Sequence, residues 1–133
     1  MENRESPKRI DLVDRELTES VIGAFFGVYN ELRYGLLENL YTEALARELV
    51  NRGRRVAREV RIQIYYKGEV IGLQRIDMIV DERLVVEVKS THDLSKASHR
   101  QVLSYLRGSR LQLALLLHFG PEAKFYRIIS SMR

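Results

Sequence analysis

The sequence lacks cysteine, long apolar runs and internal repeats. Without cysteine among its 133 residues, neither a disulfide framework nor a thiolate metal site can form. The longest apolar stretch, LALLLHF, is far shorter than the ~20 residues that a membrane-spanning helix needs. The first residues show no apolar core of a secretory signal. We therefore expect a cytoplasmic protein with no membrane partner.

Size and composition indicate one globular domain. Hydrophobic residues make up 45% and charged residues 30% of the chain, which is typical of a folded protein and not of a disordered one. Residues 1–15 are polar and aperiodic, and we interpret them as a flexible N-terminal tail. Residues 16–133 are then a single domain.

The charge is basic, and arginine supplies most of it. The net charge is +4, and 17 of the 22 basic residues are arginine. Such a surface is compatible with nucleic-acid binding through phosphate contacts, although many proteins that bind none share it. The densest basic run contains Arg54, Arg55, Arg58 and Arg61. It is either a solvated strand edge or a strip that contacts DNA.

Apolar periodicity predicts an α/β sandwich around a mixed sheet. Helices are expected at 17–32 and 36–53, strands at 56–66, 70–80 and 84–90, a helix at 93–109, and strands at 111–119 and 124–130. Thr18 is a candidate N-cap of the first helix, and Asp93 or Ser95 of the third. The run 111–119 is nearly all apolar, as expected for a strand covered on both faces. The order is ααβββαββ.

The hairpin QRIDMIVDERLVVEVKS, residues 74–90, carries Asp77, Glu87 and Lys89 among aliphatic residues. Unpaired charges on a half-buried surface cost several kcal/mol. A loop centred on Glu82 pairs position 77 with 87 and position 75 with 89, whereas a two-residue turn puts the two carboxylates on opposite faces.

The apolar pattern of the hairpin favours the first register. Two apolar sets are expected to share one face: Ile76, Met78 and Val80 in one strand, and Leu84, Val86 and Val88 in the next. Matching these sets places Asp77 opposite Glu87, with Cβ atoms ~5 Å apart.

Two carboxylates this close repel unless a cation or a proton lies between them. One interpretation is an exposed face in which Arg75 and Lys89 form salt bridges. The other is a site for a hard divalent ion such as Mg²⁺, with Lys89 beside it. The second arrangement fits metal-assisted hydrolysis of a phosphodiester.

The spacing D-x9-E-x-K resembles the PD-(D/E)XK nuclease superfamily, with "ID" in place of "PD". The stretch GLLENLY, residues 35–41, resembles the namesake motif of the GxxExxY family within that superfamily. The resemblance extends from about Leu17 to Ile129. It implies a restriction-endonuclease-like sandwich and a Mg²⁺ or Mn²⁺ cofactor, and it makes Glu38 the helix-borne acid of the site.

Roles follow from this hypothesis. Asp77 and Glu87 hold the metal together with the backbone carbonyl of Val88, and Lys89 orients or activates the attacking water. Glu38 binds a second metal or a water on the metal. Gln101 supports Lys89 or a phosphate.

Gln101 and Tyr105 form a Q-x3-Y pair that resembles a helical motif beside the active site of exonuclease-like members of the superfamily. Tyr105 is a candidate nucleic-acid contact. The alternative is a solvent-facing glutamine and a packed tyrosine. Tyr41 is expected in the core, and His92, His99 and His118 have no ligand spacing, so we interpret them as structural or surface residues.

The leading hypothesis is a metal-dependent nuclease that hydrolyses DNA. The alternative is a catalytically silent nucleic-acid-binding or assembly module with the same fold, and a third class is a purely structural oligomerisation domain. The exposed apolar content of helix 17–32 suggests a homodimer. Because the chain has no room for a separate specificity domain, a protein partner that supplies specificity is also expected.

Overall fold

The computed structural model describes residues 5–130, with side chains described from Asp14 onward. Its elements are α1 (Glu5–Leu32), α2 (Glu38–Asn51), β1 (Val56–Tyr66), β2 (Glu69–Val80), β3 (Leu84–Lys89), α3 (Lys96–Ser109), β4 (Leu113–Phe119) and β5 (Ala123–Ile129). This is the predicted order, and the strand bounds agree to within two residues. Among the described residues, no helix has both the length and the apolar character that crossing a membrane requires.

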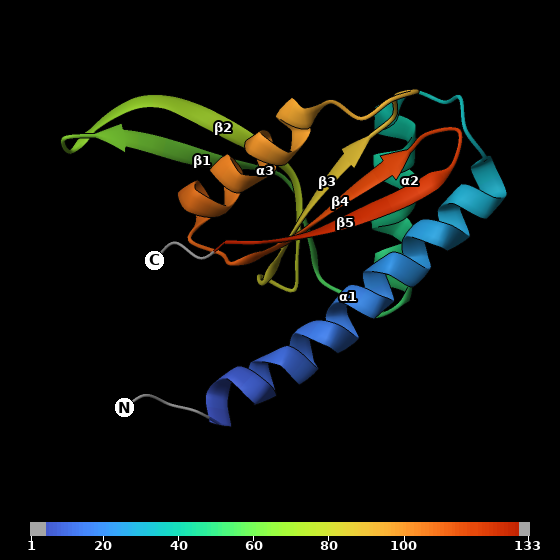
Figure 1. Ribbon diagram of the computed structural model, residues 1–133, viewed down its shortest axis with the longest axis horizontal. Coiled ribbons are helices and arrows are strands. Elements are labelled where there is room, and N and C mark those ends of the chain that lie inside the picture. Colours follow the sequence, from blue (N-terminus) through green and yellow to red (C-terminus); the bar gives the residue numbers. More distant parts are fainter. Residues whose placement is uncertain (1–4, 131–133) are drawn as a thin grey trace.

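The five strands form one mixed sheet in the order β1-β2-β3-β4-β5. All neighbours are antiparallel except β3 and β4, which are parallel and joined through α3. Helices α1 and α2 lie on one side of the sheet and α3 on the other (Figure 1). The predicted α/β sandwich is confirmed.

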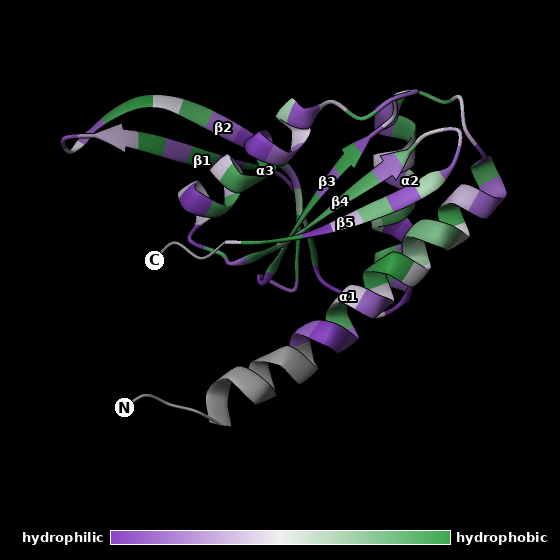
Figure 2. Cartoon of the chain, viewed as in Figure 1, coloured by the Kyte–Doolittle hydropathy of each residue, from purple (hydrophilic) through white to green (hydrophobic). Residues whose placement is uncertain are grey.

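Two apolar clusters fill the layers on either side of the sheet. The larger one packs α1 and α2 against alternate residues of β3 and β4, and α1 contributes residues at helical spacing: Leu17, Val21, Ala24, Phe25 and Val28. The smaller one lies under α3 and uses the other parity of the same strands. Strand β4 is buried along its whole length and is mostly apolar in Figure 2, with His118 as the exception, which confirms the strand predicted to be covered on both faces.

The N-terminal helix differs from the prediction. It begins at Glu5, so Thr18 is not an N-cap but lies inside the helix, where its hydroxyl donates to the Arg15 carbonyl. Of the predicted flexible tail, residues 1–4 lie outside the described residues. The predicted cap of the third helix is confirmed, because the Ser95 side chain accepts from the Ala97 N–H.

The turn between β2 and β3 has three residues and gives the predicted register. Met78 pairs with Val86 and Val80 with Leu84, so continuing the ladder places Asp77 opposite Glu87. Asp81 (φ 53°) and Glu82 (φ 58°) are both left-handed in this turn. The Asp81 carboxylate accepts from the Arg55 N–H (2.9 Å) and from the Arg54 guanidinium (3.0 Å), which fixes the turn.

One part of the predicted hairpin pattern is wrong. Ile76 does not share a face with Met78 and Val80, because it packs in the cluster under α3 whereas they pack under α1 and α2. The ladder between β1 and β2 skips Asp77 and its neighbour Glu59, which adopts a left-handed conformation (φ 50°). At this irregularity the alternation of side chains between the two faces of the sheet is interrupted in both strands, and the Asp77 carboxylate points toward β3.

Beyond the irregularity, β1 and β2 leave the sheet as a two-stranded arm, residues 60–76, which projects over α3 (Figure 1). The arm approaches the helix closely at Gly108, where a Cβ would lie 2.9 Å from Ile62 Cγ2 and 3.3 Å from Ile64 Cδ1. Because the ladder between β2 and β3 ends at Met78 and Val86, the two strands diverge beyond that pair. We call the region between the diverging parts of β2 and β3 the fork.

Candidate active site

The fork begins where the β2–β3 ladder ends. The last paired residues are Met78 and Val86, although β3 continues to Lys89. At the next position the Val88 N–H donates to Asp77 Oδ2 at 2.8 Å. The carboxylate takes the place of a backbone acceptor, so Asp77 is held at the mouth of the fork.

Glu87 and Lys89 lie on β3, two residues apart and therefore on the same face. The Glu87 side chain is only 4% exposed, and its Oε2 lies 3.3 Å from Lys89 Nζ. Its other oxygen, Oε1, is buried without a hydrogen-bond partner. Burying a carboxylate oxygen without a hydrogen bond is costly, so Glu87 Oε1 is a candidate ligand for a cation.

Glu38 reaches the same place from the other layer. It is the first residue of α2, and the Ser90 N–H donates to its carboxylate. The turn before it is built by Gly35 (φ 122°) and by Tyr41, whose hydroxyl accepts from the Leu36 N–H and donates to the Arg33 carbonyl. The motif thus has a structural account: glycine permits the turn, tyrosine anchors it and glutamate faces the fork.

Electrostatics show that the three acids form one cluster. Burial raises the pKa of Glu87 to about 8, and the charge of Asp77 adds to this rise while Lys89 opposes it. Burial also raises the pKa of Asp77, against the Val88 N–H and Lys89. The pKa of Glu38 is raised by burial and by the charge of Asp77. One lysine does not offset the mutual repulsion of these carboxylates.

The pair Asp77 and Glu87 fits a divalent cation. The donors are carboxylate oxygens, which hard ions prefer, and Glu87 Oε1 has no hydrogen-bond partner among the described residues. Within residues 14–130, no group of three or more histidine or acidic side chains is arranged to hold an ion. An ion such as Mg²⁺ keeps several waters and needs only one or two carboxylates from the protein, a number that Asp77 and Glu87 can supply.

Tyr105 lies beside the acids on α3, and Gln101 lies one helical turn earlier. Burial raises the pKa of Tyr105 to about 12, with further contributions from the charges of Glu87, Asp77 and Glu38. Its hydroxyl therefore stays protonated and can donate a hydrogen bond. Gln101 is half-buried, and its predicted support of Lys89 or a phosphate stays a prediction.

The predicted arginine strip divides into different environments. Arg54 is half-buried and pairs with Asp81 at 3.0 Å, so it holds the β2–β3 turn. Arg58 pairs with Glu43 of α2 at 3.0 Å, and its charge lowers the pKa of Asp77. Arg55 is 73% exposed and its nearest acid, Glu82, is 3.9 Å away. Arg61 is exposed on β1.

Sequence reasoning missed the residues that hold the loop after β3. The Ser90 hydroxyl donates to the Leu36 carbonyl at 2.7 Å, which ties the end of β3 to the turn before Glu38. His118 Nε2 lies 2.8 Å from the Thr91 carbonyl, and His118 is buried, in keeping with the structural role expected for it. Ser90 directly follows E-x-K, but a lone serine carries no signal in the sequence.

Comparisons with known proteins agree with this geometry. A family model described as the PD-(D/E)XK nuclease superfamily matches residues 15–128. Among solved structures, the crystal structure of SSO0001 is similar, with a TM-score of 0.58 and 19% identity over 71% of this chain and 50% of that one. This chain therefore spans half the length of that protein, and the likeness shows a restriction-endonuclease-like fold. No curated protein matches the sequence.

Proposed function

We propose, given that this chain belongs to the PD-(D/E)XK nuclease superfamily, that it is a metal-dependent nuclease that hydrolyses DNA phosphodiester bonds. The observation that carries the proposal is the fork itself. There Asp77, the buried Glu87 and Lys89 converge from two diverging strands, and Glu87 Oε1 lacks a partner.

In this proposal Asp77, Glu87 and the backbone carbonyl of Val88 hold Mg²⁺ or Mn²⁺. When bound, the ion supplies Lewis-acid polarisation of the phosphate and lowers the pKa of the attacking water. Asp77 is already oriented by the Val88 N–H, and Glu87 by Lys89. A cation binds only when both carboxylates are ionised. Their raised pKa values favour the protonated form, and a bound cation would favour the ionised form.

Lys89 places a positive charge next to the metal ligands. The Lys89 side chain is 22% exposed, and its Nζ lies 3.3 Å from Glu87 Oε2. There it orients the attacking water and stabilises the negative charge that develops on the phosphate. Glu38, held by the Ser90 N–H, binds a second metal or orients a water, and Gln101 supports Lys89 or a phosphate.

DNA is the proposed substrate for a chemical reason. RNA carries a 2′-hydroxyl that can serve as an internal nucleophile, whereas DNA hydrolysis needs an external water that is activated by the protein. Metal ligands beside a lysine suit that task. Arg58 and Tyr105 interact electrostatically with the acids, Arg55 lies at the β2–β3 turn, and all three are proposed to contact phosphates. Arg54, which pairs with Asp81 as Arg58 pairs with Glu43, is a further proposed phosphate contact.

We also propose that the chain belongs to the GxxExxY family of this superfamily. The support is the turn that Gly35, Glu38 and Tyr41 build together, because each motif position has its own physical task there. A homodimer and a protein partner that supplies specificity are part of the same proposal.

The test is cleavage of DNA by purified protein with Mg²⁺ or Mn²⁺ and with chelator. We expect cleavage only with the metal, and loss of cleavage by at least two orders of magnitude in Lys89→Ala. Lys124→Ala is the matched control, since Lys124 is an exposed lysine on β5. Equal cleavage in Lys89→Ala would refute the proposed chemistry. DNA binding that survives chelator, with no cleavage under any divalent ion, would instead indicate the catalytically silent module.

A further inference from the structure

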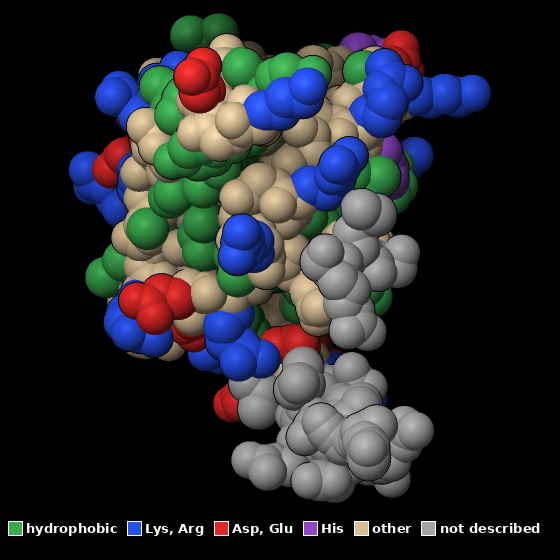
Figure 3. All heavy atoms as spheres, turned by 90° about the vertical axis from the view of Figure 1, so that its left-hand side faces the viewer, with side chains coloured by type: hydrophobic (Ala, Val, Ile, Leu, Met, Phe, Trp, Pro, Cys, Tyr) green, Lys and Arg blue, Asp and Glu red, His purple; other side chains and the backbone are tan. Residues whose placement is uncertain are grey.

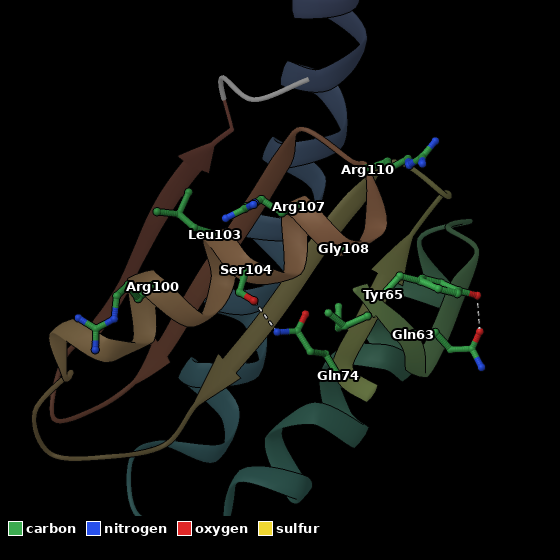
Figure 4. A pocket seen from close by; sticks show the side chains of 10 residues that line it. Gln63, Tyr65, Gln74, Arg100, Leu103, Ser104, Arg107, Gly108 and Arg110 are labelled. Atoms are coloured by element: carbon green, nitrogen blue, oxygen red, sulfur yellow. Dashed lines mark hydrogen bonds between the residues drawn. The ribbon is translucent and has the colours of Figure 1, made fainter. Parts of the chain in front are cut away.

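A second concavity lies between α3 and the arm, next to the fork but outside it (Figure 4). This α3–arm groove has a volume of about 650 Å³. The arm contributes Tyr65 and Gln74, and the helix contributes Arg100, Leu103, Ser104 and Arg107. Ser104 and Gln74 meet across it through a hydrogen bond, which joins the helix to the arm.

The groove is basic and has no acidic side chain in its lining. Arg100 and Arg107 lie two helical turns apart on the exposed face of α3, and Arg110 follows the helix end. None of the three forms an ion pair within the part of the chain that the structure describes. Figure 3, which faces this end of the molecule, shows Lys and Arg side chains around a strip of apolar ones. Such a surface has the charge of a phosphate-binding site.

The same groove exposes large apolar side chains. Tyr65, on the arm side of the groove, is 59% exposed, and Leu103, on the helix side, is 42% exposed (Figure 4). Gln74 donates to Ser104, while its Oε1 is buried without a partner at the groove floor. Arginines that track phosphates, together with an aromatic ring for stacking, are the features of a surface for single strands.

The groove is continuous with the candidate active site along two elements. On β2, Gln74 is three residues from Asp77, and the charge of Arg75 between them reaches Tyr105. On α3, Ser104 in the groove is adjacent to Tyr105 beside the acids. The groove therefore begins within a few residues of the acids on both elements.

We propose that the α3–arm groove binds single-stranded DNA next to the cleavage site. Arg100 and Arg107 contact its phosphates, and Tyr65 stacks on a base. The arm packs against α3 at Gly108, where Ile62 would lie only 2.9 Å from an added Cβ, so helix and arm are in direct contact at one end of the groove. The inference rests on the proposed function for its assignment to DNA. Substrates with a single-stranded end or segment are then the preferred class.

The experiment measures binding of a fluorescent single-stranded oligodeoxynucleotide in chelator, where no cleavage occurs. The test protein is the double variant Arg100→Gln/Arg107→Gln. We expect affinity to fall about tenfold, and the slope of log K against log [salt] to fall by about 1.4, since each phosphate contact to a single strand contributes about 0.7. Tyr65→Ser should weaken binding about tenfold without changing the slope, because stacking does not release counterions.

The matched control is Arg127→Gln. Arg127 is an exposed arginine on β5, on the side of the sheet away from α3, because its neighbour Ile128 packs under α3. It should bind as the wild type does. If the double variant binds the oligonucleotide with the affinity of the wild type, the proposed role of the groove is wrong. The same holds if the wild type binds a blunt duplex more tightly than the single strand. Tighter binding of single-stranded RNA would overturn the assignment to DNA.

The outcome is separable from that of the proposed function. If the double variant binds and cleaves as the wild type does, the groove is wrong while hydrolysis stands. If wild-type protein binds single strands through the two arginines and cleaves nothing with any divalent ion, the groove stands and hydrolysis is wrong.

Discussion

Lys89 Nζ lies 3.3 Å from Glu87 Oε2, and this contact gives a partner to only one oxygen of a side chain that is 4% exposed. The other oxygen, Oε1, is buried and unpaired. The single charge of Lys89 therefore does not balance the carboxylates of Glu87 and its neighbours. Asp77, held at the Val88 N–H, adds a second carboxylate that the protein does not neutralise. The predictions on metal and pH follow from this excess of negative charge.

A divalent cation should stabilise the wild type and not Asp77→Asn. The asparagine keeps an oxygen for the Val88 N–H but removes a charge, so in chelator the variant should melt at a higher temperature than the wild type. With Mg²⁺ at a hundredfold excess over Kd, the wild type should gain about 2.7 kcal/mol. Four melting curves, two proteins with Mg²⁺ and with chelator, measure this.

The opposite pattern would support the alternative reading of a salt-bridged surface face. There, Asp77→Asn melts below the wild type in chelator and neither protein responds to Mg²⁺. Asp77→Ala separates charge from hydrogen bonding, because it also leaves the Val88 N–H without its acceptor, which costs about 1–3 kcal/mol.

Stability in chelator should fall as the pH rises from about 4.5 to about 8. The pKa of Glu87 is raised by burial from 4.5 to about 8, so in this range the folded state binds more protons than the unfolded state. The free energy of unfolding then decreases with pH until the folded carboxyl ionises near pH 8. Asp77 and Glu38, whose pKa values are also raised, act in the same direction. Thermal melts in chelator across this range measure the slope.

Glu87→Gln should remove most of that slope, because glutamine does not titrate. Glu122→Gln, at a carboxylate 79% exposed on the surface, should leave it unchanged. If the melting temperature of the wild type in chelator does not change between about pH 4.5 and about pH 8, the pKa of Glu87 is not raised.

Tyr41→Phe should destabilise the protein by about 1–2 kcal/mol and reduce cleavage. The variant keeps the ring stacked on Phe119 at 4.1 Å but loses the hydroxyl contacts to the Leu36 N–H and the Arg33 carbonyl. The turn that presents Glu38 then loosens. Chemical denaturation and a cleavage assay check both effects, and Tyr34→Phe, at a tyrosine 42% exposed, is the control that should change neither.

Asp81→Ala should destabilise the protein by about 1–3 kcal/mol, because it leaves the Arg55 N–H and the half-buried Arg54 guanidinium without their acceptor. Since the turn sets the register of β2 on β3, cleavage should fall as well. Glu82→Ala, which changes a neighbouring carboxylate that is 84% exposed, is the matched control. Unchanged denaturation of Asp81→Ala would show that the turn does not depend on this carboxylate.

Gly108→Ala should destabilise the protein by about 1 kcal/mol or more, although alanine favours helices. The added Cβ would lie 2.9 Å from Ile62 Cγ2 and push the arm away from α3. Gly27→Ala in α1 is a direct contrast, because its Cβ would approach only Arg52 Nη2, at 4.0 Å, and it should stabilise by about 0.5–1 kcal/mol. Equal effects of the two substitutions on the unfolding free energy would contradict the close contact.

The sequence by itself determined the order of elements and most of the hairpin register. Local periodicity encodes which residues face a core, and the three-residue turn at Glu82 together with the apolar sets in β2 and β3 fixed Asp77 opposite Glu87. The spacing of Glu87 and Lys89 put both on one face, since side chains alternate along a strand. These relationships involve residues that are near one another in the chain.

Only the tertiary structure decided what distant segments do together. The parity change at Glu59 and Asp77 moved Ile76 into the other layer, and Arg54 pairs with Asp81, so this arginine holds the β2–β3 turn. Glu38 reaches the fork because the turn around Gly35 and the Ser90 N–H position it. The α3–arm groove depends on the close approach of helix and arm at Gly108. Packing between layers sets these contacts, and no local period of the sequence records it.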